Sequence, residues 1–545
     1  MLQLKSDFEI YPTTRPHRMS AKISEDPSKV KYDVSEGEIL ESNGSISSNE
    51  GNQVQAVSGD KHVVGAELFE EVLNAQIDTS DKEYAPIRRK IDMWLLPILC
   101  VTYMLQFLDK LSLNYASAYS MKEDLGLKGN DYANIAAIFN VGYLIGSLPG
   151  NWIIQKLPVA KYTGCALFVW AILLIAHVGA KNYSSMMALR FLLGLMEASI
   201  SPSNMMMCGM FYNKQEQPFR MCTFLSMNGV ATMVGALLAY GLGHSTSSAL
   251  KPWKLIFLVI GVMNFAWAII FLYVAPDSPA SARFLTHEEK LKVIERVSKN
   301  QTGIKDTKFK FVQAKEALLD LNTIILALIG LGCGVVNGGT SNFISSLIKG
   351  FGFSGLNATL LQLPTGAIEL VCVFSAGMIA LFTKRNVRTI LLFVLCIPTL
   401  AGLIGIHVIP LSHKWALVGC CWLLYIIGGP VIMCWILMNV TVAGSSKLST
   451  AKIMWFLMYT AGNITGSKIF YAKEAPRYNT GMKGLIGSYA GMMFLSIVYY
   501  LLMFRRNQGR NSKFGKLNPE TERAGIINGF NDQTDFENQY FRYHY

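Results

Sequence analysis

Charged residues are scarce in this 545-residue chain. Asp, Glu, Lys and Arg make up 16% of it, against about 25% in soluble globular domains, and hydrophobic residues make up 51%. The apolar excess is concentrated in about twelve runs, each near the roughly 20 residues that an α-helix needs to cross a bilayer. This composition excludes an ordinary soluble protein and predicts an all-α membrane protein.

The chain also lacks the motifs of the common catalytic sites. It contains no phosphate-binding glycine loop, no two-histidine metal motif and no nucleophile elbow. Its ten cysteines all fall in the apolar runs without metal-ligand spacing, so we expect neither a disulfide framework nor a metal site. We therefore expect no enzyme, no cofactor and no nucleotide-driven pump; the proton gradient would supply the energy for transport.

The apolar runs fall into two groups of six. The first group lies within 87–275 and the second within 321–504, and a polar segment, 276–320, separates them. This division is typical of a two-bundle transporter and predicts twelve transmembrane helices in two six-helix bundles. Within the polar segment, Thr286-His-Glu-Glu289 is a capping box before spaced apolar residues, which predicts a short amphipathic helix.

The basic residues of the short loops are nearly equal in number on the two sides of the predicted bilayer, so the orientation rests on the termini and the basic central segment. Arg88-Arg89-Lys90 precedes the first span, and a basic cluster opens the tail 505–545. The positive-inside rule then predicts that both termini and the central segment are cytoplasmic. Residues 1–86 are polar and contain no secretory signal, so we predict a disordered cytoplasmic tail. The formal charge of +12 is explained by anchoring beside the membrane rather than by nucleic-acid binding.

Four charged residues lie where the predicted spans should be apolar. Arg190 and Glu197 are seven residues apart, about two helical turns, and so share one face of the fourth span. Asp109 and Lys110 end the first span and point about 100° apart, which lets each face a different partner on the fourth span. A charge at the bilayer centre costs at least about 2.5 kcal/mol, so such residues indicate a substrate or ion pathway.

The chemistry of these groups indicates different roles. The planar guanidinium of Arg190 suits a carboxylate or sulfonate, whereas a buried Glu197 can take up a proton, cross with the substrate and release it. A structural alternative stays open for both pairs. Arg190 and Glu197 could form an ion pair that locks the bundle, and Asp109 with Lys110 could form a local ion pair or cap a helix end. Weaker candidates could line a polar cavity or simply bond between helices; they are Asn140, Tyr143, Asn228, Asn337, Glu369 and Asn463.

Seven ordered segments match one known family. They are Phe107-Leu-Asp-Lys110, Arg190-Phe-Leu-Leu-Gly-Leu-Met-Glu-Ala198 with Pro202, Trp253-Lys-Leu-Ile-Phe257, Pro276-Asp-Ser-Pro-Ala-Ser-Ala-Arg-Phe-Leu-Thr286, Leu363-Pro-Thr-Gly-Ala-Ile-Glu369, Ala475-Pro-Arg-Tyr478 and Thr534-Asp-Phe-Glu-Asn-Gln-Tyr-Phe-Arg-Tyr543. From Arg88 to Tyr543 the chain resembles the allantoate permease family of fungal anion:cation symporters, within the major facilitator superfamily. One departure is the loop 150–161, which lacks the acid that this superfamily usually places in a charge lock between its bundles.

The resemblance implies proton-coupled uptake of a small organic anion at the plasma membrane by alternating access. It also implies that Asp109, Lys110, Arg190 and Glu197 serve coupling and substrate binding. The anion could be allantoate or another ureido acid, a vitamin-like carboxylate, a sulfonate or other sulfur anion, or a dipeptide. The partners would be this anion, protons and the lipid bilayer, and we expect a monomer. The competing hypothesis is a nutrient receptor that binds a similar ligand and signals without flux.

Overall fold

The computed structural model describes residues 81–154, 156–213, 216–245, 250–298, 310–382, 387–518, 521, 525 and 532–545. Most of the predicted tail 1–86 lies outside these ranges. Residues 81–86 are described, and they are helical: α2 begins at Asp81, before the predicted boundary, and continues into the first span. The predicted disorder therefore extends too far at this end.

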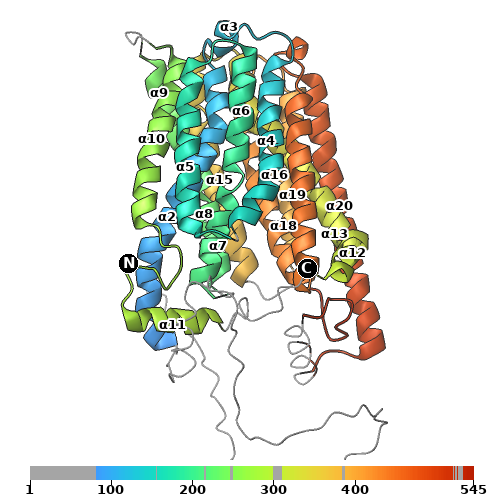
Figure 1. The fold of residues 1–545 in the computed structure, drawn as a ribbon. Coiled ribbons are helices and arrows are strands. Elements are labelled where there is room, and N and C mark those ends of the chain that lie inside the picture. The colour runs from blue at the N-terminus through green and yellow to red at the C-terminus, as the bar shows by residue number, and fades with distance from the viewer. Residues whose placement is uncertain are drawn as a thin grey trace, which may run out of the picture. The chain divides into compact units, whose positions relative to one another are not determined.

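Helices α2 to α10 form the N-terminal half (Figure 1). Their bounds are α2 Asp81–Ser117, α3 Met121–Asp124, α4 Asp131–Ile154, α5 Val159–Ala176, η1 His177–Gly179, α6 Tyr183–Glu197, α7 Ile200–Phe211, α8 Gln217–Leu225, α9 Met227–Gly243 and α10 Pro252–Val274. The predicted fourth span is thus divided into α6 and α7. Pro202 explains this break, because it lies in the first turn of α7 and lacks the N–H that a continuous helix needs there.

Helices α13 to α20 form the C-terminal half. Their bounds are α13 Leu321–Gly350, α14 Gly355–Leu360, α15 Leu363–Phe382, α16 Arg388–Val408, α17 Lys414–Leu423, η2 Leu424–Ile427, α18 Gly428–Thr441, α19 Ser445–Lys468, η3 Ala472–Glu474 and α20 Asn479–Phe514. The last helix is longer than the span predicted to end at Phe504, because the basic sequence that follows continues the helix to Phe514.

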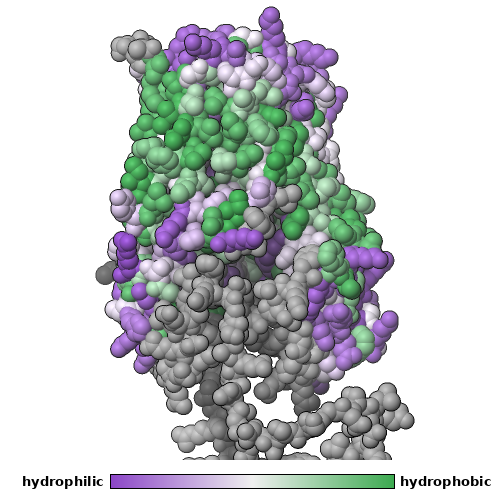
Figure 2. Space-filling model, in the orientation of Figure 1, coloured by the Kyte–Doolittle hydropathy of each residue, from purple (hydrophilic) through white to green (hydrophobic). Residues whose placement is uncertain are grey.

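Within the described residues, nine helical stretches are long and apolar enough to cross a membrane. The other three predicted spans correspond to α4, to the pair α6 and α7, and to α19, which are helical as well. Figure 2 shows a belt of hydrophobic side chains on this face, between a hydrophilic surface at the α3 end and polar groups toward α11. The chain is an all-helical membrane protein with many spans.

Small residues allow helices to approach one another closely. A Cβ atom on Gly142 of α4 would lie 2.2 Å from the carbonyl oxygen of Phe191 in α6, so the two backbones are in contact there. The glycine repeat of the second predicted span therefore packs helices within the N-terminal half. The two halves also touch, at Gly229 of α9 and Gly366 of α15, each facing the other's carbonyl oxygen.

The linker between the halves contains two helices. Helix α11, His287–Ser298, begins after Thr286, whose N–H donates to Glu289 Oε2 at 2.8 Å while Glu289 N–H donates to Thr286 Oγ1 at 3.3 Å. These are the bonds of the expected capping box. Lys90 Nζ lies 2.7 Å from Glu289 Oε2, which ties α11 to the start of α2. Helix α12, Phe311–Leu319, was not predicted from the sequence.

The C-terminal segment 532–545 also differs from a simple tail. Thr534, Asp535, Tyr543 and Tyr545 are all buried, against the ends of α19 and α20. Arg510 of α20 donates to main-chain carbonyl groups of Asn538 and Phe541, so the segment is held by its backbone as well as by side chains. The final residues therefore belong to the folded C-terminal half.

Candidate functional site

Asp109 lies near the end of α2 and is completely buried in the N-terminal half. Its carboxylate accepts hydrogen bonds from Trp170 Nε1 of α5, at 2.7 Å, and from Ser112 Oγ, at 3.3 Å. Ser112 Oγ in turn accepts from Arg190 Nη2 of α6, at 3.0 Å. One serine hydroxyl therefore links the acid of the first span to the guanidinium of the fourth.

Arg190 is only 1% exposed, yet its hydrogen-bonding capacity is not filled. Its guanidinium carbon lies 5.2 Å from the centre of the Phe257 ring, and Nε has no hydrogen-bond partner among the described residues. Within these residues Arg190 forms no ion pair with Glu197, the arrangement that a purely structural role would favour. A buried guanidinium with spare donors can bind an added carboxylate or sulfonate.

Lys110 points away from Asp109 and reaches the other half of the molecule. Its Nζ donates to Asn337 Oδ1 of α13, at 2.6 Å. This hydrogen-bond partner is on the seventh predicted span, whereas the sequence suggested a partner on the fourth. Glu197 of the N-terminal half and Glu369 of the C-terminal half both interact electrostatically with Lys110. Lys110 is therefore the point where charges of the two halves meet.

Glu197 and Glu369 are similar in their surroundings. They are 3% and 4% exposed, and the Oε2 atom of each has no hydrogen-bond partner among the described residues. Gln106 lies near Glu197, while Asn228 and Thr232 of α9 lie near Glu369. Because a buried, unpartnered carboxylate oxygen is costly when ionised, both groups are suited to accept a proton.

A small cavity joins several of these residues. Its volume is about 10 Å³, and Lys110, Asn140 and Arg190 line it together with Asn342 of α13. That volume suffices for roughly one water molecule, so the helices are closed around the two basic groups in this conformation. Since α2, α4 and α6 supply one wall and α13 the other, the cavity lies between the two halves.

Hydrogen bonds between the halves also gather at the α3 end of the molecule. Asn114 Nδ2 of α2 donates to Gln362 Oε1 at 2.9 Å, and Asn114 Oδ1 accepts from Ser345 N–H of α13 at 3.0 Å. Tyr132 Oη of α4 donates to the Asn342 carbonyl oxygen at 2.6 Å. The molecule is therefore held closed on the α3 side.

The comparisons with known proteins agree with this geometry. Residues 99–467 match the model of the Major Facilitator Superfamily. The allantoate permease of Saccharomyces cerevisiae is 31% identical over 86% of this chain and 88% of its own length. The chain belongs to the allantoate permease family of the Major Facilitator Superfamily. It is a secondary transporter and not an enzyme.

Two further proteins resemble this chain. A Schizosaccharomyces pombe protein, "uncharacterized transporter C460.05", is 37% identical to this transporter over 87% of this chain and 89% of its own. The crystal structure of a bacterial homolog of the human lysosomal transporter Spinster, inward-facing and unoccupied, aligns with a TM-score of 0.54 at 14% identity, covering 75% of this chain and 96% of that one. The second likeness shows the fold alone.

The remaining predicted site residues of the transporter lie in different settings. Tyr143 of α4 packs against Phe456 of α19, with ring centres 5.8 Å apart, and so lies between the halves. Asn463 donates to the Tyr459 carbonyl oxygen of its own helix at 2.9 Å, and it does not line the small cavity. Asn140 does line the cavity, but its amide also donates within its own helix, to Ala136, at 3.3 Å.

Sequence reasoning missed the polar residues that orient the charges. Trp170 and Ser112 hold Asp109, and Asn342 completes the cavity wall. Ser112 follows Asp109 by three residues, a spacing that places both on one helical face and could have identified it. Trp170 could not have been identified in this way, because a tryptophan in an apolar span is ordinarily a packing residue.

A second buried charge cluster lies at the other end of the C-terminal half. Lys447 of α19 is completely buried, and its Nζ lies 2.8 Å from Glu316, 3.0 Å from Asp320 and 2.6 Å from Asp535. Arg506 of α20 lies 2.8 Å from Asp320. Burial alone would raise the pKa of Asp320, but the charges of Lys447 and Arg506 outweigh burial and hold this pKa below its usual value.

Proposed function

We propose that this transporter takes up a small organic anion together with protons by alternating access. The observation that carries the proposal is that Lys110 and Arg190, from two different helices, line one cavity between the halves. In the described residues neither forms an ion pair with a carboxylate, so both are available to an anionic substrate. One carboxylate or sulfonate could accept from Lys110 Nζ, in place of Asn337, and from the free donors of Arg190.

The charge balance of the site gives a reason for proton coupling. Lys110 and Arg190 are positive, whereas Asp109, Glu197 and Glu369 are negative when ionised, so the site has one negative charge in excess. An added anion would increase this excess inside a low-dielectric region, which is unfavourable. Protonation of Glu197 or Glu369 removes one negative charge for each proton, so anion binding and proton binding favour each other.

We assign the proton to Glu197 first and to Glu369 second. Each has a buried carboxylate oxygen without a partner, whereas Asp109 accepts from both Trp170 and Ser112. These two bonds favour the ionised form of Asp109, which would then hold Arg190 in place through Ser112. Asp109 would take part in coupling through this position rather than by carrying the proton.

The substrate class follows from the charges and from the relatives. The allantoate permease of Saccharomyces cerevisiae makes allantoate or another ureido acid the first candidate, and vitamin-like carboxylates and sulfonates carry the same anionic group. We further propose a plasma-membrane location with both termini cytoplasmic, which places the closed α3 side outside the cell. This orientation rests on Arg88, Arg89 and Lys90 before the first span and on the basic end of α20.

Uptake assays test the proposal directly. The gene would be expressed in a transporter-deleted yeast strain, and growth would be scored on single nitrogen, sulfur or vitamin sources, each an organic anion. Uptake of a substrate found in this way should rise as external pH falls, and a protonophore should abolish its accumulation. Accumulation that persists unchanged with the protonophore would refute proton coupling. Binding without flux in reconstituted vesicles would favour the receptor hypothesis.

A further inference from the structure

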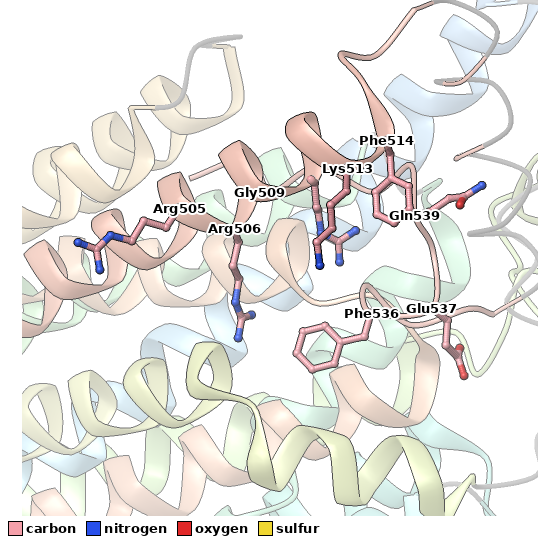
Figure 3. A pocket seen from close by; sticks show the side chains of 9 residues that line it. Arg505, Arg506, Gly509, Lys513, Phe514, Phe536, Glu537 and Gln539 are labelled. Carbon is pink, nitrogen blue, oxygen red and sulfur yellow. The ribbon is translucent and has the colours of Figure 1, made fainter.

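A large basic cavity lies outside the transport site. It has a volume of about 450 Å³ and lies between the end of α20 and the C-terminal segment (Figure 3). Arg505, Arg506, Arg510 and Lys513 of α20 line it, and Glu537 is the one acid among the described lining residues. A volume of this size is typical of small-molecule sites, and the excess of positive charge selects an anionic ligand.

Several of these basic groups lack a hydrogen-bond or ion-pair partner among the described residues. Arg506 Nη2 is bound to Asp320, but the Nη1 atom of the same guanidinium is buried and has no hydrogen-bond partner among the described residues. Arg505 and Lys513 form no hydrogen bond or ion pair with any other described residue and are exposed. Arg510 differs, because it donates to carbonyl groups of the C-terminal segment and so builds the wall of the cavity.

The cavity is also placed at the edge of the membrane. Phe494, Ile497, Leu501 and Phe504 are exposed at helical spacing on α20 and form a lipid-facing stripe that ends directly before Arg505. Apolar surface continues into the cavity itself, where Phe514 and Phe536 are 46% and 47% exposed. Figure 3 shows Phe536 on the C-terminal segment, on the side of α20 toward which Arg506 and Lys513 point. An anion that also carries apolar groups fits this combination.

We propose that this cavity binds the phosphate-bearing headgroup of an anionic membrane lipid. The phosphate would contact Arg505 and Lys513 beside the guanidinium of Arg506, while the first carbons of the lipid would pack on the two phenylalanines. Because four basic residues face one acid, a headgroup with several phosphates binds more tightly than one with a single net charge. Free phosphate esters share this chemistry, but they cannot use the apolar surface or the lipid-facing stripe.

The test compares two double variants of the full-length transporter in nanodiscs. One is Arg505→Gln with Lys513→Gln, which removes the two basic residues without partners. The other is Arg283→Gln with Lys315→Gln, a matched control that removes two exposed basic residues of the linker. The nanodiscs contain phosphatidylcholine with a minor fraction of phosphatidylinositol bisphosphate. Native mass spectrometry measures retained lipid, and soluble inositol trisphosphate serves as a competitor.

We expect the wild type and the control to retain phosphatidylinositol bisphosphate, and the Arg505→Gln, Lys513→Gln variant to bind it on the order of tenfold more weakly. Three outcomes would overturn the proposal. The wild type could show no preference over phosphatidylcholine. Both double variants could lose binding equally, which would mean unspecific surface attraction. Inositol trisphosphate could displace the lipid at equal concentration, which would assign the cavity to a soluble phosphate ester.

Discussion

Two buried charge clusters in this transporter contain the same kinds of groups but are built differently. The cluster between the halves has Lys110 and Arg190 with three acids, and the cluster beside the C-terminal segment has Lys447 and Arg506 with three acids. In the second cluster each base lies within 3.0 Å of a carboxylate. In the first, among the described residues, neither base forms an ion pair. Paired charges hold a structure together, whereas unpaired charges remain available to a ligand and a proton.

The largest expected effect concerns the paired cluster. Replacement of Lys447→Met should destabilise the protein by about 3–5 kcal/mol, because it leaves the buried carboxylates of Asp320 and Asp535, with the partly buried Glu316 beside them, without their cation. Thermal unfolding of the purified protein in detergent measures this. Lys315→Met, at an exposed position on α12, is the control and should unfold like the wild type. If the two variants unfold at the same temperature, the cluster is not structural.

Arg190→Lys tests the unpaired cluster. The charge remains, but the planar fork that can hold a carboxylate is lost, so we expect kcat/KM for uptake to fall on the order of a hundredfold. Stability should change little, because among the described residues the Arg190 side chain donates one hydrogen bond, to Ser112. Arg283→Lys, at an exposed position of the linker, is the matched control for uptake. Unchanged uptake with Arg190→Lys would contradict substrate binding by Arg190.

Glu197→Gln separates coupling from binding. An amide mimics the protonated acid permanently, so we expect the variant to exchange substrate across the membrane but to lose accumulation against a gradient and the dependence on external pH. Glu369→Gln, measured beside it, shows which of the two glutamates carries the proton. Accumulation against a gradient by Glu197→Gln would rule out the role that we assign to Glu197.

The smallest expected effect concerns the hydrogen bonds on the α3 side. Tyr132→Phe removes one bond to the Asn342 carbonyl oxygen, worth about 1 kcal/mol, and should shift the equilibrium several-fold toward opening on that side. Labelling of Asn140→Cys by an impermeant thiol reagent measures the opening. Tyr273→Phe, at a position exposed to lipid, should leave the labelling rate unchanged. Slower labelling with Tyr132→Phe would show that this bond does not hold the α3 side closed.

Much of the helical fold could be predicted, because the sequence patterns that indicate its helices are local. Apolar runs of sufficient length and the capping box at Thr286 each depend on residues within a few turns of one another. Helix α12 was not predicted, because it lies in a polar segment and its apolar face is too short to form a long apolar run. The folded C-terminal segment was not predicted for another reason. It is stabilised by contacts with residues distant in the sequence, such as that of Asp535 with Lys447.

The sequence by itself determined that charged residues lie inside membrane-spanning helices, and it placed Asp109 and Lys110 on different faces of one helix. Only the tertiary structure decided the partners: Trp170 and Ser112 for Asp109, and Asn337 of the other half for Lys110. The physical reason is that helical periodicity sets the direction of a side chain within its own helix. The hydrogen-bond partner depends on which distant helix packs against that face, and short-range sequence patterns do not contain that information.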